Sequence, residues 1–213
     1  MTRIAIIDYG MGNLHSVSKA VEHVADVDVI VSSDAEAILQ ADKVIFPGVG
    51  AIRDCIAELR THELTDVVKQ CATSKPFLGV CLGMQALLTH SDENNGIDCL
   101  DIFAGNVKRF DSGLQDEQGN KLKIPHMGWN QVNQLGHHPM WQGIDDGSRF
   151  YFVHSYYVAP NDADATVGAT HYGVDFTAVI ARDNIFAAQF HPEKSQHAGM
   201  QLLTNFVNWD GQS

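Results

Sequence analysis

The chain has 213 residues, 45% of them hydrophobic, which is enough for one sizeable core and predicts a single domain over residues 1–213. Its formal net charge of -12, from 26 acidic against 14 basic residues, argues against nucleic acid and against anionic membrane surfaces as partners. The 4 cysteines include no C-x-x-C pair and the 11 histidines offer no complete ligand set, so we expect a cytoplasmic protein with free thiols, no metal and no cofactor.

The first half of the chain predicts alternating strands and helices. Continuous apolar runs, typical of strands that are buried on both faces, occupy residues 4–7, 27–31, 43–46 and 76–80. Helical periodicity is found between them, at residues 14–25, at 35–40, from about 51 to about 60, and at 64–71. This order predicts a parallel sheet that is covered by helices.

The second half predicts shorter strands that pair in antiparallel fashion. Segments of β-forming residues, separated by Gly, Asn and Asp turns, occupy residues 107–110, 130–132, 150–158, 166–170, 176–180 and 185–190. A last helix is expected at residues 195–209 with Ser195 as its N-cap, and a polar exposed loop at 111–123. The fold class is therefore α/β, with a mixed, mostly parallel central sheet that is flanked by helices.

Residues 77–85 contain the pattern most directly related to chemistry. An apolar strand runs into Cys81, a helix is expected to begin at once, and Gly79 and Gly83 flank the cysteine. This layout is typical of a nucleophile elbow, whose tight turn strains the central residue and exposes its side chain. We expect a thiolate at Cys81 that is favoured by the helix start, and a backbone N–H of Leu82 that faces an oxyanion. A buried structural cysteine is the alternative interpretation.

A histidine and a carboxylate follow the last predicted strand. In an extended chain, His191 and Glu193 would point the same way, and Pro192 restrains His191 to an extended conformation. The carboxylate could then hold the imidazole in one tautomer while the other ring nitrogen meets a thiol. Both this pair and Cys81 lie at carboxyl ends of strands, where open α/β sheets form their sites.

The segment Pro-Gly-Val-Gly at residues 47–50 also follows a strand. Glycine lets a backbone approach a substrate closely, so we predict that Val49 and Gly50 form the second wall of an oxyanion hole. An ordinary strand-to-helix turn would explain the same residues.

Together these motifs resemble the class I (triad) glutamine amidotransferases. The resemblance rests on residues 79–85 and 191–193. Through residues 8–13, 47–50, 125–130, 152–156 and 191–195 it extends, over residues 4–207, to the glutaminase subunits of imidazole glycerol phosphate synthases. It implies that Cys81 is the nucleophile, His191 the acid and base, and Glu193 the residue that orients His191, and that the substrate is glutamine. It also implies that ammonia passes, in histidine biosynthesis, to a separate (β/α)8-barrel cyclase within a heterodimer.

The resemblance further implies binding roles for particular residues. Those expected to contact glutamine are Gly50, Gln85, Glu93, Ser155 and Tyr156, and those expected to face the cyclase are Asn13, Trp129 and Lys194. Ile52 and Ser155 depart from the family pattern, which more often has an aromatic residue and threonine there. We also form the hypothesis that a peptide flip beside Val49, permitted by the glycines on both sides of it, completes the oxyanion hole only when the cyclase is occupied.

Three other functions remain open from the sequence. The chain could be a glutaminase subunit of another synthase, such as that for pyridoxal phosphate, anthranilate or GMP. It could instead be a cysteine hydrolase or peptidase on the same sheet. A non-catalytic relative is the third, although the presence of Cys81, His191 and Glu193 argues against a decayed site.

Overall fold

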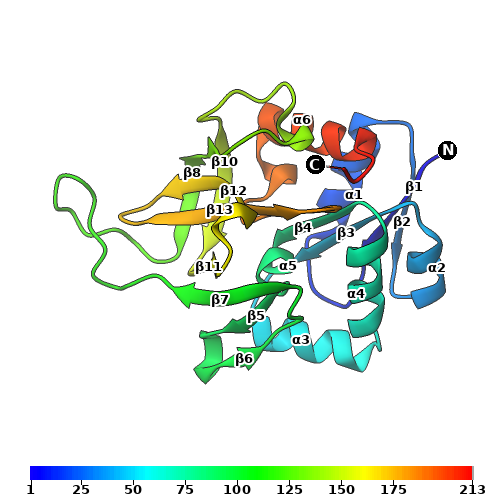
Figure 1. Cartoon of the computed structure of the whole chain (residues 1–213), viewed down its shortest axis with the longest axis horizontal. Helices are drawn as coiled ribbons and strands as arrows, with labels where there is room; N and C mark the ends of the chain where they lie inside the picture. The colour runs from blue at the N-terminus through cyan, green and yellow to red at the C-terminus, as the bar shows by residue number, and fades with distance from the viewer. Residues whose placement is uncertain (213) are drawn as a thin grey trace.

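The computed structural model describes residues 1–212 and places the first half of the chain in a parallel sheet (Figure 1). Its strands lie side by side in the order β2 (Asp28–Ser32), β1 (Arg3–Ile7), β3 (Lys43–Gly48) and β4 (Phe77–Cys81). The helices between them are α1 (Leu14–Val24), α2 (Ala35–Gln40), α3 (Ile52–Thr61) and α4 (Thr65–Ser74). All the strands and helices predicted for this half are present, with small shifts of their ends.

The second half extends the same sheet with mostly antiparallel strands. β14 (Ile185–Ala188) pairs parallel with β4, and beyond it lie β13 (Asp175–Arg182), β11 (Tyr156–Pro160) and β7 (Phe103–Arg109), each antiparallel to the strand before it. Four further strands complete this sheet: β5 (Leu88–Ser91), β6 (Ile97–Asp98), β9 (Asn133–Gln134) and β12 (Thr166–His171). β8 (His126–Gln131) and β10 (Arg149–His154) form a separate antiparallel pair. The predicted mixed sheet is confirmed.

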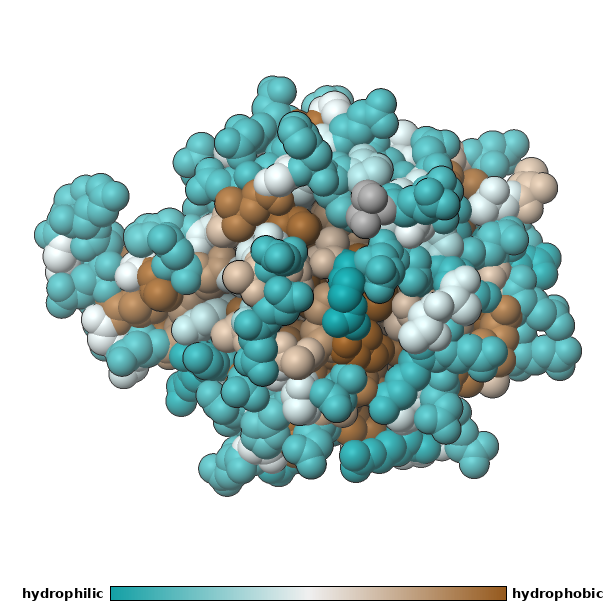
Figure 2. All heavy atoms as spheres, in the orientation of Figure 1, coloured by the Kyte–Doolittle hydropathy of each residue, from teal (hydrophilic) through white to brown (hydrophobic). Residues whose placement is uncertain are grey.

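The sheet separates two hydrophobic cores. Alternation along β1 divides its side chains, so Ala5 and Ile7 face the layer of α2, α3 and α4, whereas Ile4 and Ile6 face the layer of α1 and α6 (Gln196–Asn208). The β8–β10 pair lies on the second side, where Phe150 and Phe152 join that core. Hydrophilic residues cover most of the face seen in Figure 2, with hydrophobic residues in separate patches between them. No helix within residues 1–212 is both long and apolar enough to cross a membrane.

The prediction of a single strand at residues 150–158 is wrong. The structure divides it at Ser155 into β10 and β11, which belong to different sheets. Phe150, Phe152, His154 and Val158 are all buried, so the alternation stays in phase across the break and the sequence pattern does not reveal it. The Ser155 carbonyl accepts a hydrogen bond from the N–H of Phe110 at the bend.

The helix expected after Cys81 is also shorter than predicted. α5 is one turn, Leu82–Gln85, and the chain continues into β5, which the sequence reading did not foresee. Every residue from 82 to 88 is buried, so this segment lacks the solvent-facing positions that an amphipathic helix has. A single turn carries little of a helix dipole, which weakens the dipole argument for a reactive thiol.

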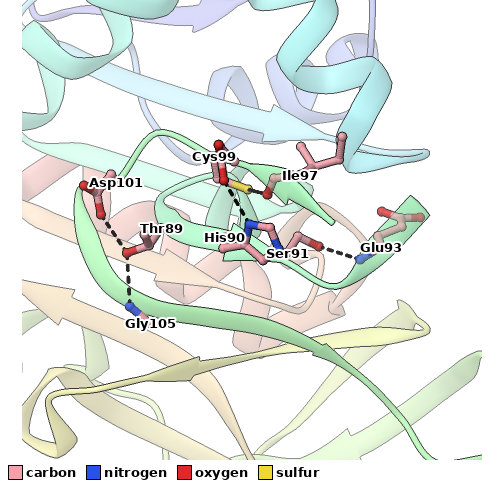
Figure 3. A network of polar contacts seen from close by, with 9 residues as sticks. Thr89, His90, Ser91, Glu93, Ile97, Cys99, Asp101 and Gly105 are labelled. Carbon is pink, nitrogen blue, oxygen red and sulfur yellow. Dashed lines mark hydrogen bonds and ion pairs between the residues drawn. The ribbon is translucent and has the colours of Figure 1, made fainter. Parts of the chain in front are cut away.

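The loop that follows β5 is fixed by side-chain hydrogen bonds (Figure 3). The Thr89 hydroxyl donates to the Asp101 carboxylate at 2.6 Å and accepts from the N–H of Gly105 at 3.3 Å. The Ser91 hydroxyl accepts from the N–H of Glu93, which begins the 3-10 helix η1 (Glu93–Asn95). This network positions Glu93 at the edge of the site described below.

Buried Lys43 joins the sheet to the end of α6. Its Nζ donates to the carbonyls of Phe206 (3.2 Å) and Trp209, and the Phe206 carbonyl also accepts a longer bond, at 3.3 Å, from the N–H of Trp209. Replacing Lys43 with methionine is expected to lower the free energy of unfolding by about 2 kcal/mol, because both carbonyls lose a charged donor. Chemical denaturation measures this, with exposed Lys69→Met as the control. Equal losses in the two variants would contradict the assignment.

Candidate active site

Cys81 lies at the tip of a strained turn. It ends β4 with φ 55° and ψ −111°, a conformation that residues with a side chain rarely adopt. The turn is possible because Gly83 passes against β3, where a Cβ on it would lie 1.9 Å from the carbonyl oxygen of Phe46. At Gly79 the nearest atom to such a Cβ belongs to the Ala187 side chain, at 2.8 Å. Of the two glycines that flank Cys81, Gly83 is therefore the one that a neighbouring backbone approaches too closely for any side chain. The strained elbow predicted from the sequence is thus present.

His191 and Glu193 form a buried ion pair beside this turn. The Nδ1 atom of His191 lies 2.9 Å from Oε1 of Glu193, and the two side chains are 2% and 1% exposed. His191 is extended, as expected before proline, but the next residues form a 3-10 turn, η4 (Pro192–Lys194), rather than the extended chain assumed from the sequence. The N–H of Lys194 closes this turn on the His191 carbonyl at 3.1 Å. The imidazole and the carboxylate meet nonetheless.

The side chain of Ser195 holds His191 in place instead of capping α6. Ser195 occupies the predicted N-cap position, where its carbonyl accepts from the N–H of Gly199, but its side chain makes no capping hydrogen bond. Its hydroxyl donates to the His191 carbonyl at 2.6 Å and accepts from the N–H of Tyr151 at 2.9 Å. The N–H of His191 in turn donates to the Tyr151 carbonyl at 3.0 Å. β10 therefore anchors the backbone of His191.

The environment of His191 favours the protonated ring. Burial alone would lower the pKa of His191, but its interactions with Cys81 and with Glu193 raise it to about 9. The Nε2 atom is buried and makes no hydrogen bond to any other atom of residues 1–212, whereas Nδ1 is committed to Glu193. The ring can therefore exchange a proton on the Nε2 side while the carboxylate fixes its orientation.

Substitution Glu193→Gln is expected to make His191 lose its proton at a lower pH. In the wild-type chain the imidazolium should persist until the pH passes about 9. In the variant, only the interaction with Cys81 remains to oppose the effect of burial, which lowers the pKa of His191. Because the folded-state pKa lies above 6.5, the pair stabilises the fold fully below pH 6.5 and progressively less as the pH rises through about 9. NMR of 15N-labelled histidine follows the ring directly. A His191 titration unchanged by the substitution would contradict this account.

A cavity of about 300 Å³ opens in front of Cys81 and His191. All the residues predicted to contact glutamine line it, namely Gly50, Gln85, Glu93, Ser155 and Tyr156. Val49, Leu82 and His154 line it as well. The residues predicted for the oxyanion hole therefore line the same cavity as Cys81.

Two of the side chains that line the cavity, those of Gln85 and Glu93, make hydrogen bonds within the protein. The amide nitrogen of Gln85 donates to the Tyr156 carbonyl at 3.1 Å and to Oε1 of Gln189 at 2.9 Å, so its oxygen is the atom with capacity to accept. Oε2 of Glu93 accepts from the N–H of Ile52 at 2.8 Å, at the start of α3. Glu93 thus links the loop after β5 to the segment that follows Gly50.

The residues predicted to face a partner lie on a different part of the surface. Trp129 on β8 is 39% exposed, and its ring lies 6.1 Å from that of Tyr151. The Lys194 ammonium lies 6.0 Å from the same Tyr151 ring, so Trp129 and Lys194 share one neighbour. Asn13 precedes α1, which packs against η4. The structure thus places Trp129 and Lys194 beside the same Tyr151 ring, and Asn13 just before a helix that packs against η4.

Sequence reasoning missed three buried polar residues near the site. Gln189 lies two residues before His191, and His126 and His154 form a buried pair at 2.9 Å. The signal for Gln189 was available, because it is a polar residue at the end of a strand that is otherwise apolar. The histidine pair depends on the register of β8 and β10, which no local pattern encodes. Within residues 1–212 no cluster of three or more His, Cys, Asp or Glu side chains could hold a metal ion.

Comparison with known proteins decides the family. The family model for "Glutamine amidotransferase class-I" matches residues 5–209. The chain belongs to the class I glutamine amidotransferase family. This glutamine amidotransferase is 56% identical to the "Imidazole glycerol phosphate synthase subunit HisH" of Pseudomonas putida, over 99% of each chain. It is 57% identical to subunit HisH 1 of Pseudomonas aeruginosa, again over 99% of each, and 55% identical to HisH of Nitrosococcus oceani over the whole of both chains.

Solved structures share the fold of this glutamine amidotransferase at low sequence identity. A crystal structure described as a glutamine amidotransferase aligns with a TM-score of 0.72 at 14% identity, covering 96% of this chain and 97% of the other. A chain of the PurLQS structure from Thermotoga maritima aligns with a TM-score of 0.72 at 16% identity, over 97% and 98%. These matches confirm the predicted fold class.

Proposed function

We propose that this amidotransferase hydrolyses glutamine to glutamate and ammonia, and that it supplies the ammonia to the cyclase of an imidazole glycerol phosphate synthase in histidine biosynthesis. The observation that carries the proposal is the cavity that joins Cys81, His191 and the predicted glutamine contacts in a chain so similar to HisH subunits along its whole length. The cavity, about 300 Å³, lies at the small end of ligand sites, which favours a free amino acid over a peptide.

The first half-reaction would form a thioester on Cys81. The thiolate attacks the δ-carbon of glutamine, and the N–H groups of Leu82 and of Val49 or Gly50 hold the oxyanion, each worth on the order of 3 kcal/mol. The His191 imidazolium then donates its proton to the departing nitrogen, the C–N bond breaks, and ammonia leaves. A glutamyl thioester and a neutral imidazole remain.

The second half-reaction would release glutamate. His191 accepts a proton from water, whose oxygen attacks the thioester carbon, and the C–S bond breaks to restore the thiolate and the imidazolium. Glu193 keeps Nδ1 occupied throughout, so the same ring nitrogen serves both steps. The substrate would be bound by the cavity-lining residues Gly50, Gln85, Glu93, Ser155 and Tyr156.

The partner is proposed to be a (β/α)8-barrel cyclase that forms a heterodimer with this chain in the cytoplasm. Ammonia that escapes into neutral water becomes ammonium and is no longer a nucleophile, so a docked acceptor makes chemical sense. Trp129 and Met127 support a contact between β8 and the cyclase, because these large apolar side chains are 39% and 62% exposed. Lys194 and Asn13 would lie at the same interface.

Labelling and transfer experiments test the proposal in two steps. A glutamine-derived chloroketone should label Cys81 and block glutamate formation, whereas a peptide-based chloroketone should not; the reverse preference would favour a peptidase. Purified cyclase with its ribonucleotide substrate should then form imidazole glycerol phosphate from glutamine only when this chain is present. Failure with the cyclase but success with another synthase would reassign the partner.

The free subunit is expected to hydrolyse glutamine more slowly than the complex whose cyclase holds its nucleotide. Gly50 has φ +94° and lies beside exposed Val49, so the peptide there has room to rearrange. Steady-state release of glutamate, with and without the loaded cyclase, measures the difference. Equal rates would end the hypothesis that a peptide flip completes the oxyanion hole.

A further inference from the structure

Gln189 is a fully buried amide that the mechanism above does not use. It follows β14 (Ile185–Ala188), and its backbone N–H donates to the Ala178 carbonyl at 2.8 Å. Its side-chain nitrogen, Nε2, lies 3.7 Å from the sulfur of Cys81, within hydrogen-bond reach for sulfur. The side-chain amide of Gln189 thus contacts the sulfur of Cys81 directly.

The orientation of this amide follows from its other partner. The Tyr156 carbonyl can only accept, so the Gln85 group that contacts it at 3.1 Å must be the amide nitrogen. The second hydrogen on that nitrogen points to Gln189 at 2.9 Å, where it needs an acceptor, so Oε1 of Gln189 faces Gln85. The amide of Gln189 therefore presents its N–H to Cys81 and cannot turn over without breaking the bond to Gln85.

The Tyr156 carbonyl is itself held by a pair of buried histidines. Nδ1 of His154 donates to it at 2.7 Å, which leaves Nε2 of His154 to accept from Nδ1 of His126 at 2.9 Å. The side-chain nitrogen of Asn130 lies 3.2 Å from Nε2 of His126 and donates to it. Burial lowers the pKa of His126 to about 4 and that of His154 to about 3, so both rings are neutral and each carries one N–H. Every donor in the chain from Asn130 to Cys81 therefore has one possible direction.

We propose that Gln189 is a positioning residue for the nucleophile, whose N–H holds the Cys81 sulfur as a thiolate aimed into the cavity. Gln85, which donates both to the Tyr156 carbonyl and to Oε1 of Gln189, fixes the direction of that N–H, and the histidine pair helps to hold the Tyr156 carbonyl in place. The inference rests on the proposed role of Cys81 in glutamine hydrolysis. An amide N–H at a sulfur stabilises the thiolate more than the thiol, because only the anion is a strong acceptor.

The pH dependence of Cys81 alkylation tests this inference on the full chain. Iodoacetamide reacts with thiolates, and mass spectrometry of the Cys81 peptide separates its rate from those of the other cysteines. Gln189→Met keeps a side chain of similar size without the N–H, so the alkylation midpoint should rise by about one pH unit, and at pH values well below the wild-type midpoint the rate should fall by about tenfold. A folded Gln189→Met variant with the wild-type midpoint would overturn the proposal, because a purely structural amide would change only the thermal stability.

A second measurement keeps the test decisive if Gln189→Met does not fold. In the wild-type chain, the side-chain amide proton of Gln189, observed by NMR in protein labelled with 15N-glutamine, should shift with the same midpoint as the alkylation of Cys81. An amide resonance that does not respond to that titration would overturn the proposal. Neither measurement uses glutamine or the cyclase. Failure of the proposed function would appear instead as a wild-type chain that forms no glutamate.

Discussion

Replacing Cys81 with alanine is expected to lower glutamine hydrolysis by about 10⁴-fold or more, because the chain would lose the sulfur that we propose forms the bond to the substrate. Alanine keeps the Cβ, so the steric strain of the backbone at φ 55° should be the same in the variant as in the wild type. Release of glutamate, measured with and without the cyclase, gives the effect on rate.

The control for this substitution is the cyclase reaction fed with an ammonium salt. Cys81→Ala should leave that reaction unchanged, because Cys81 is buried, 7% exposed, and is not among the residues proposed to face the cyclase. A variant that still hydrolyses glutamine would remove Cys81 from the mechanism. A variant that also fails with ammonium would show that the substitution disturbs the complex rather than the chemistry.

Substitution Gly83→Ala is expected to lower the free energy of unfolding by more than about 3 kcal/mol. The added methyl group would lie 1.9 Å from the Phe46 oxygen and 2.9 Å from its carbonyl carbon, on the central strand β3. Backbone on both sides of the contact is buried, so neither partner can move aside without loss of sheet pairing. Denaturation monitored by circular dichroism measures the loss.

Gly136→Ala is the matched control for that prediction. Gly136 has φ +79°, but nothing lies within 4 Å of an added Cβ, so only the left-handed conformation opposes alanine, at a cost of about 1–2 kcal/mol. Losses of similar size at the two positions would show that backbone conformation, rather than the contact with Phe46, makes glycine necessary at Gly83.

Much of this architecture could be predicted because its signals are local. The buried strands of the parallel sheet are continuous apolar runs, and the glycine beside Cys81 marks a turn where Phe46 leaves no room for a side chain. The ion pair of His191 with Glu193 joins residues two apart in the chain. Such features need no knowledge of how distant segments pack.

The errors arose where distant segments decide the structure. The break at Ser155 depends on which sheet each half of the segment joins, and buried residues keep to even-numbered positions on both sides of it, at His154 and Val158. The helix after Cys81 is a single turn because the chain soon joins the sheet as β5, which pairs with the distant β7. Ser195 has the residue type of a cap, yet its hydroxyl is used by β10 and by His191. In each case tertiary packing overrode a local preference.

Acid-quenched mass spectrometry of the enzyme during turnover tests the central claim, a covalent glutamyl intermediate on the Cys81 sulfur, most directly. The wild-type chain, mixed with glutamine and the loaded cyclase, should show the mass of one added glutamyl group on the peptide that contains Cys81, and His191→Ala should show none. Glutamate that accumulates with no adduct at any time, or with an adduct on a different residue, would contradict the account.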